Sequence, residues 1–409
     1  MRPARTLIFA VLVGGAARAA IGCAEDGFTS LDQADAAPEP DSSVVASPPV
    51  VEDGGDDAVP EDASADAGVP CSRDGFCHTR LPGRDTFDAG DLAPDLDVSF
   101  DLVDVSVAPG GAAWAVTTGG HLLEWRDEAW SVAYVAGTAL RKVWAASDDD
   151  VWFAGNSGFV MHGTRAAGAP MVFEDAKLTA TLPVLGLVGF EDEIWAYANN
   201  VLYRRASPAD GGAAWIATPV PVSVQGTSPA AQLTGLWRGP TGQVWLAGRV
   251  YNSCFSGCVY VSRPAIWKRT TVDSVVSFDE IPFTYDAVSY TGVIASAERA
   301  DRPFACIGQP CSSVLQPAED GSTSAELTGL SEGQIEAAWA SGPDEAWLVG
   351  SPGVVRRWNG TEWTYARVTV TNAPIVKPLH AVSGYVDASG SIDMWIVGKD
   401  TALHRKVTK

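Results

Sequence analysis

Cysteine spacing gives the clearest indication of chemistry in this chain, which has seven cysteines in 409 residues. Thiolates can form disulfides, accept a lipid or hold a metal ion. Only His78 adjoins a close pair, and the intervals of five, three and four residues do not repeat the two-residue interval common in zinc sites. We therefore predict no metal site and three disulfides, which are typical of an oxidising compartment. The predicted pairs are Cys71/Cys77, Cys254/Cys258 and Cys306/Cys311.

The remaining cysteine, Cys23, ends a segment with the features of an export signal. Two arginines open this segment, an apolar stretch follows at residues 7–17, and small residues precede Cys23. The arrangement resembles a bacterial lipoprotein signal, in which the cysteine is lipidated and becomes the new N-terminus. Ala20 stands where leucine is usual and Arg18 interrupts the apolar stretch, so a plain secretory peptide is the alternative.

Candidate recognition residues cluster beside the second cysteine pair. Arg249, Tyr251, Asn252 and Phe255 combine a positive charge, an amide and aromatic rings within the stretch RVYNSCFSGCVY. Inserted loops on a rigid scaffold are where binding residues commonly lie. We predict a binding site at these residues, and a tolerated insertion without a ligand is the alternative.

Catalytic chemistry has little support in the sequence. No nucleophile elbow, zinc-protease motif, phosphate-binding loop or dinucleotide-binding fingerprint occurs. We therefore predict no catalytic residues and no cofactor. Acids and arginines brought together from distant parts of a fold would escape local motifs, so an enzyme remains the alternative. The five histidines fall at unrelated points: His78, His121, His162, His380 and His404.

The elements that must position these residues are defined by an internal repeat. A tryptophan, here called the anchor, recurs in short apolar runs at intervals of 38, 43, 50, 102 and 48 residues. The interval of 102 residues is two periods, and Ile294 takes the anchor position near its middle. The sequence thus predicts seven units of roughly 47 residues each. The anchor tryptophans are Trp114, Trp152, Trp195, Trp245, Trp347 and Trp395.

Finer registers support the same repeat. A second tryptophan stands eight residues before the anchor in three units, and a glycine suited to a hairpin turn follows six residues after it in three. Basic and acidic residues recur later in the units, where we predict a solvated outer strand. The second tryptophans are Trp144, Trp237 and Trp339, and the hairpin glycines are Gly120, Gly158 and Gly353. The residues of the predicted outer strand are Glu124, His162, Arg357 and Arg405.

Each unit has the pattern of a four-stranded sheet. Short apolar or alternating runs are separated by Asp, Gly, Pro and Ser, with no amphipathic helical stretch. The second unit predicts strands at LRKVWAAS, DDVWFAG, GFVMHGT and APMVFED. Four-stranded units of about 40 to 50 residues that must stack on one another are the blades of a β-propeller. We predict an all-β, seven-bladed propeller whose anchor indoles are buried between blades.

The ends of the chain predict how the ring closes and how it is tethered. The last unit lacks a fourth strand, and we predict that residues 95–102 (DLDVSFDL) supply it as an N-terminal closing strand. Residues 24–70 hold 13 acidic residues and no Lys or Arg, which predicts a disordered tether. The predicted organisation is a signal peptide at 1–22, a tether at 23–70, a cysteine-bracketed lead-in at 71–94 and the propeller at 95–409.

The repeat resembles the secreted β-propeller lipoproteins of myxobacteria and related bacteria. DVWFAG and WNGTEW match their Trp-Ala-Val-Gly-type units, and CSRDGFC followed by Leu81-Pro82 is similar to a short motif that precedes those propellers. The resemblance covers residues 71–409 and the lipoprotein start. It implies a fold and an export route rather than a particular chemistry.

These features together predict an exported protein, lipid-anchored at the outer membrane or cell surface, that acts as a non-catalytic binding or scaffold module. The expected partners are the membrane, through the anchor, and an envelope protein or glycan. A net charge of −22 argues against nucleic acid, and we expect a monomer. The alternative is a propeller hydrolase or lyase acting on extracellular glycans.

Overall fold

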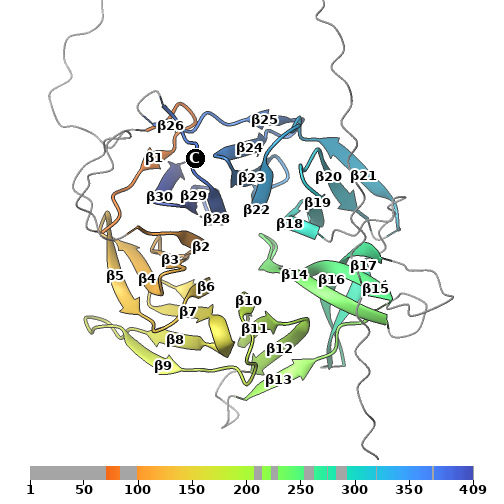
Figure 1. Cartoon of the computed structure of the whole chain (residues 1–409), viewed down its shortest axis with the longest axis horizontal. Coiled ribbons are helices and arrows are strands. Elements are labelled where there is room, and N and C mark those ends of the chain that lie inside the picture. The colour runs from red at the N-terminus through yellow and green to blue at the C-terminus, as the bar shows by residue number, and fades with distance from the viewer. Residues whose placement is uncertain are drawn as a thin grey trace, which may run out of the picture. The chain divides into compact units, whose positions relative to one another are not determined.

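The computed structural model contains a compact unit at Asp66–Lys409. Its described residues are 71–82, 99–206, 214–222, 229–252, 262–273, 275–281, 293–318, 320–370 and 373–408. Among them, seven four-stranded antiparallel sheets surround a common centre as the blades of a β-propeller (Figure 1). This arrangement confirms the predicted fold class. Within the same residues no helix is long and apolar enough to cross a membrane.

The first strand of each blade lies at the centre of the ring (Figure 1). Blades 1 and 2 comprise β2 (Leu102–Val107), β3 (Ala113–Thr117), β4 (His121–Arg126) and β5 (Ala129–Val135), then β6 (Leu140–Ser147), β7 (Asp150–Gly155), β8 (Val160–Thr164) and β9 (Val172–Asp175). Blades 3 and 4 comprise β10 (Val184–Phe190), β11 (Glu193–Ala198), β12 (Val201–Ala206) and β13 (Trp215–Thr218), then β14 (Pro229–Arg238), β15 (Val244–Asn252), β16 (Ser262–Val272) and β17 (Val275–Ile281).

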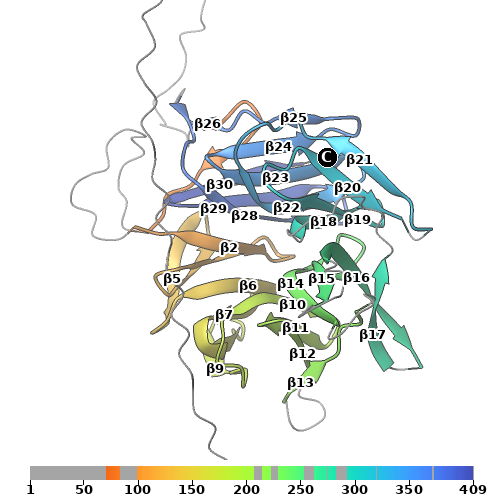
Figure 2. The same ribbon diagram turned by 45° about the vertical axis from the view of Figure 1, so that its right-hand side comes forward.

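Blades 5 and 6 comprise β18 (Val293–Arg299), β19 (Arg302–Ile307), β20 (Ser313–Pro317) and β21 (Thr323–Leu327), then β22 (Gln334–Gly342), β23 (Glu345–Ser351), β24 (Val354–Trp358) and β25 (Trp363–Tyr365). Blade 7 comprises β28 (Leu379–Val386), β29 (Ile392–Gly398), β30 (Thr401–Val407) and the N-terminal β1 (Cys77–His78). A short 3-10 turn, η1 (Asn156–Gly158), follows β7, and a two-stranded sheet of β26 (Thr369–Val370) and β27 (Ala373–Pro374) lies at the periphery (Figure 2).

The ring is closed by an N-terminal strand, but not by the segment that we predicted. Strand β1 pairs with β30, with Cys77 opposite His404 and His78 opposite Leu403. The prediction that residues 95–102 close blade 7 is therefore wrong: Leu102 begins the first strand of blade 1, and residues 95–98 lie outside the described residues.

The physical reason is the apolar burial that the Cys71–Cys77 segment achieves. Phe76 is 0% exposed and packs edge-on against the anchor Trp347 with ring centroids 5.2 Å apart. Thr79 donates from N and Oγ1 to Ala402 O at 3.0 Å and accepts a hydrogen bond from Trp130 Nε1 at 2.9 Å. Phe76 and Thr79 therefore join blades 6, 7 and 1.

The anchor tryptophans are buried as predicted, with exposures from 0 to 7%. Blade 5 differs from the prediction, because Ile294 lies on the first strand, β18. Phe304 on β19 takes the anchor position: it is 0% exposed and lies opposite Ala297, as Trp347 lies opposite Trp339. The anchor of blade 5 was misplaced because halving the interval of 102 residues assumes units of equal length. Blade 4 is longer than the others, since its strands β15 and β16 are long.

Third strands stack a basic side chain on the anchor indole in several blades. The His162 ring lies 4.0 Å from that of Trp152, and His162 Nε2 is 3.0 Å from Asp150 Oδ1. Because the acid stands two residues before the anchor, Asp150 and His162 of one hairpin meet beside the indole. Blade 7 repeats the arrangement with Asp393, Trp395 and His404.

The prediction that these positions lie on a solvated strand is wrong for Glu124 and Arg405, which are 5% and 7% exposed. Glu124 accepts hydrogen bonds from Arg165 NH2 at 2.6 Å and from Arg126 Nε at 2.6 Å. Burial acts to raise the pKa of Glu124, but the two guanidinium groups outweigh it and hold that pKa below its ordinary value. These side chains connect neighbouring blades.

Candidate binding site in the central channel

Strand β15 carries three of the predicted recognition residues near its end. Arg249 donates from Nε to Gln232 Oε1 at 2.7 Å, and its guanidinium lies 5.5 Å from the ring centroid of Tyr251. Asn252 is only 2% exposed. The structure thus brings Arg249 and Tyr251 together and places Asn252 in the interior. Phe255 lies outside the described residues, so the four-residue site stays a prediction.

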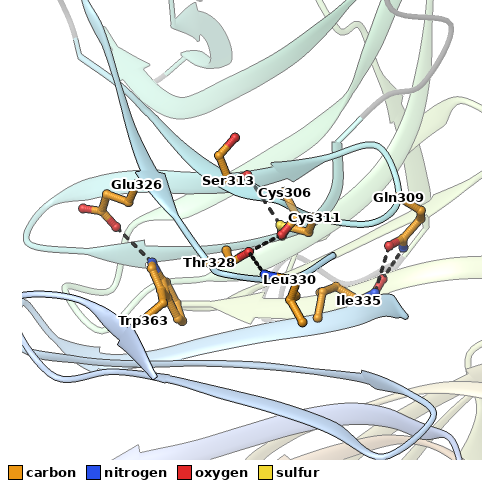
Figure 3. The surroundings of a disulfide bond; sticks show 9 residues. All are labelled: Cys306, Gln309, Cys311, Ser313, Glu326, Thr328, Leu330, Ile335 and Trp363. Carbon is orange, nitrogen blue, oxygen red and sulfur yellow. Dashed lines mark hydrogen bonds between the residues drawn. A yellow bond between two sulfur atoms is a disulfide. The ribbon is translucent and has the colours of Figure 1, made fainter. Parts of the chain in front are cut away.

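Two of the predicted disulfides are formed, Cys71–Cys77 and Cys306–Cys311. The second disulfide closes the loop between β19 and β20, and both of its cysteines are 0% exposed. Gln309 in this loop pairs with the backbone of Ile335 in blade 6, donating at 2.7 Å and accepting at 3.0 Å (Figure 3). The loop is therefore fastened to its neighbour. Cys254 and Cys258 lie outside the described residues.

The described residues enclose a central channel with a volume of about 530 Å³. Its wall is built from the first strands of all seven blades. Volumes of roughly 300 to 1,000 Å³ are typical of small-molecule sites. The channel is thus large enough for a ligand, and every blade contributes to it.

One level of the channel wall consists of the residues that lie opposite the anchors. Indoles from blades 2, 4 and 6 alternate there with small side chains from the other blades. Each indole lies across from its own anchor tryptophan and remains partly exposed. The level comprises Ser106, Trp144, Val188, Trp237, Ala297, Trp339 and Ser383.

Glycines of the next blade position two of these indoles. A β-carbon at Gly189 would overlap Cη2, Cζ2 and Cζ3 of Trp144, so this ring covers the glycine. Gly384 has the same relation to Trp339. Because no side chain separates ring from backbone, each indole lies directly against the backbone of the next blade, and both residues line the channel.

An ion pair provides the polar part of the wall beside Trp144. Lys142 Nζ lies 3.4 Å from Asp104 Oδ1, and Val143 N donates to Asp104 Oδ2 at 3.0 Å. Burial raises the pKa of Asp104 despite the opposing effect of Lys142. Burial, reinforced by Asp104, also raises the pKa of Tyr197, which keeps that phenol protonated. The wall beside Trp144 therefore carries its acidic and basic side chains as a pair.

Buried polar groups at the other end of the wall are also paired. Glu298 is 1% exposed and accepts hydrogen bonds from Trp245 Nε1 at 2.9 Å and from Thr241 Oγ1. Ser383 and Tyr385 of blade 7 line the channel as well, and neither hydroxyl is hydrogen-bonded to another described residue. These two hydroxyls are available to a ligand.

A titratable cluster lies at one end of the first strands, just before the channel-lining residues. His380 Nδ1 is 2.5 Å from Glu336 Oε2, and His380 Nε2 is 3.2 Å from Asp101 Oδ1. Glu336 and His380 are the extra residues of β-bulges in blades 6 and 7. An imidazole between two carboxylates can take up or release a proton. Over the described chain, no set of three His, Cys, Asp or Glu residues is arranged to hold a metal ion.

Sequence reasoning did not identify the channel as the candidate site. Trp144, Trp237 and Trp339 were visible only as a register eight residues before the anchors. Their convergence requires the ring to close, and the glycines that seat them belong to other blades. Bulge residues such as His380 and Glu336 carry no local motif at all.

The chain matches no protein-family model and no curated protein. Solved structures are similar at low sequence identity. YCF48 bound to D1 peptide is 17% identical, with 77% of this chain and 95% of that chain covered and a TM-score of 0.53. The extracellular domain of BT4673 from B. thetaiotaomicron is 12% identical over 82% of this chain and 40% of that chain, with a TM-score of 0.55.

An inactive virginiamycin B lyase from Staphylococcus aureus, with quinupristin, is 12% identical over 76% of this chain and 96% of that chain, with a TM-score of 0.54. These propellers bind different molecules or have different roles. At such identities the similarity concerns the fold alone.

Proposed function

We propose that this protein is an exported, lipid-anchored propeller that binds a ligand at the cell envelope without transforming it. The central channel is the observation that carries the proposal. Its volume of about 530 Å³, its three partly exposed indoles and its two hydroxyls that are not hydrogen-bonded to another described residue are features of a binding site.

Export and anchoring are supported by the cysteines. The two disulfides are typical of proteins that fold in an oxidising compartment. Cys23, at the end of an apolar signal segment, is the residue that we propose to be lipidated. The predicted residues Arg249, Tyr251, Asn252 and Phe255 are proposed as a second contact region.

The test of binding uses the immobilised full chain and a screen of envelope extracts and purified glycans. We expect saturable retention of a ligand that is recovered unchanged, and loss of retention when Trp144 and Trp339 are both replaced by alanine. Binding in the channel would be contradicted if the native chain retains no ligand, or if the double variant retains as much ligand as the native chain.

A glycan-active hydrolase or lyase is the second candidate, and the cluster of His380, Glu336 and Asp101 favours it. A histidine poised between carboxylates beside a channel is suited to general acid-base chemistry. This candidate predicts a new product whose formation stops in His380→Ala. Loss of product with retained ligand binding would establish catalysis, and absence of product from the native chain would exclude it for that ligand.

A further inference from the structure

We propose that the ligand of the central channel is a saccharide, with a sugar ring lying against one or more of the three channel indoles. This inference rests on the proposed binding function and specifies its ligand class. It is carried by the geometry of the indoles, by the charge balance of the wall and by the hydroxyls of blade 7.

Indoles in the channel wall are suited to contact a sugar ring. Trp144 and Trp339 each cover a glycine of the next blade, and both line the channel. The π face of an indole is electronegative, whereas the axial C–H groups of a pyranose are weakly electropositive. A flat ring with C–H groups on one side is therefore suited to stack on the π face of an indole that lines the channel.

Charge balance argues against a cationic ligand. The carboxylate of Asp104 is paired with Lys142 at 3.4 Å. Glu298 is buried and satisfied by Trp245 and Thr241. A cation in an aromatic cage is commonly balanced by a carboxylate, and both wall carboxylates already have partners. Arg238 also lines the channel and forms no ion pair with another described residue, so the wall can accept a saccharide with an acidic group as well as an uncharged one.

Polar groups argue against a purely apolar ligand. Ser383 lies on the same level as the indoles, and Tyr385 follows two residues later on the same strand. Neither hydroxyl bonds to another described residue. Covering them with hydrocarbon would leave polar groups without partners, which is costly. A sugar offers hydroxyl groups at its edge and C–H groups on its face, so it satisfies both features.

The test titrates the purified full chain with neutral hexasaccharides of β-1,4-linked glucose, N-acetylglucosamine and xylose, and of α-1,6-linked mannose. Choline and a proline-rich peptide are titrated in parallel. Tryptophan fluorescence and calorimetry report binding. We expect at least one hexasaccharide to bind, with affinity lowered about tenfold or more in Trp144→Ala and in Trp339→Ala, the size of loss expected for removing a stacking ring.

Two further variants keep the result interpretable. Tyr385→Phe removes one hydroxyl and leaves the ring, so it should fold normally and weaken binding by about three- to tenfold. Trp215→Ala removes a partly buried indole of β13 outside the channel, and it should leave affinity unchanged.

The outcomes separate this inference from the proposed function. Saccharide binding that is insensitive to the channel variants, or channel binding of choline or peptide without any saccharide, overturns the inference and leaves a binding module. If neither these probes nor any component of envelope extracts binds, both the saccharide inference and the proposed binding function are overturned. Saccharide binding with the expected losses supports both.

Discussion

Replacing Phe76 by alanine tests how the ring closes. Phe76 is 0% exposed, packs on Trp347 at 5.2 Å and directly precedes the closing strand β1. Its ring therefore fixes the segment that completes blade 7. The strand β1 itself has only two residues, both partly buried.

The expected loss is about 3 to 5 kcal/mol, since truncating a buried phenylalanine removes apolar burial and leaves a cavity. With a urea dependence of about 3 kcal/mol per M, the unfolding midpoint should fall by about 1 M or more. Tryptophan fluorescence follows the transition, because anchor indoles leave the interior when the blades separate.

Val132→Ala provides the control, because Val132 on β5 is 43% exposed. Its midpoint should change by less than about 0.2 M, as for most surface substitutions. If Phe76→Ala has the same midpoint as Val132→Ala, the role that we assign to Phe76 in closing the ring is refuted.

Three other predictions concern titration, the disulfide and the anchor. Burial, with a smaller effect of Lys377, lowers the pKa of His78 from 6.5 to about 4. Because the unfolded chain then binds the proton more readily, stability should be full above pH 6.5 and fall by up to about 3 kcal/mol towards pH 4. Between these pH values, the urea midpoint should depend less on pH in His78→Gln than in the native chain. Replacing Cys306 and Cys311 together by alanine should lower stability by about 2 kcal/mol in the same assay. An unchanged urea midpoint after reduction of the native chain would contradict this prediction. Cys23→Ala should abolish uptake of labelled fatty acid and partitioning into detergent, and unchanged membrane association of that variant would exclude this anchor.

The fold could be predicted because its determinants are local and repeated. A buried tryptophan on each second strand imposes the same sequence pattern in six blades, and hairpin glycines mark the turns with positive φ, as at Gly120 and Gly353. The pattern weakened where packing tolerates a substitute: Phe304 fills the anchor position of blade 5, and nothing local distinguishes it from Ile294.

The closing strand and the channel could not be predicted because both depend on contacts between distant segments. Cys77 and His404 are far apart in sequence, and the residues 95–102 have a better strand pattern than the two residues of β1. The seating of Trp144 on Gly189 depends on how adjacent blades stack, which a strand pattern does not encode.

Mass analysis of the ligand recovered from the full chain tests the central claim most directly. The chain is incubated for hours with an excess of the envelope glycan fraction that it retains, and bound and free material are compared. Binding without transformation predicts saturable retention, an unchanged ligand mass and loss of retention in the Trp144→Ala, Trp339→Ala double variant. A shortened or unsaturated product that disappears in His380→Ala would contradict the claim and identify an enzyme instead.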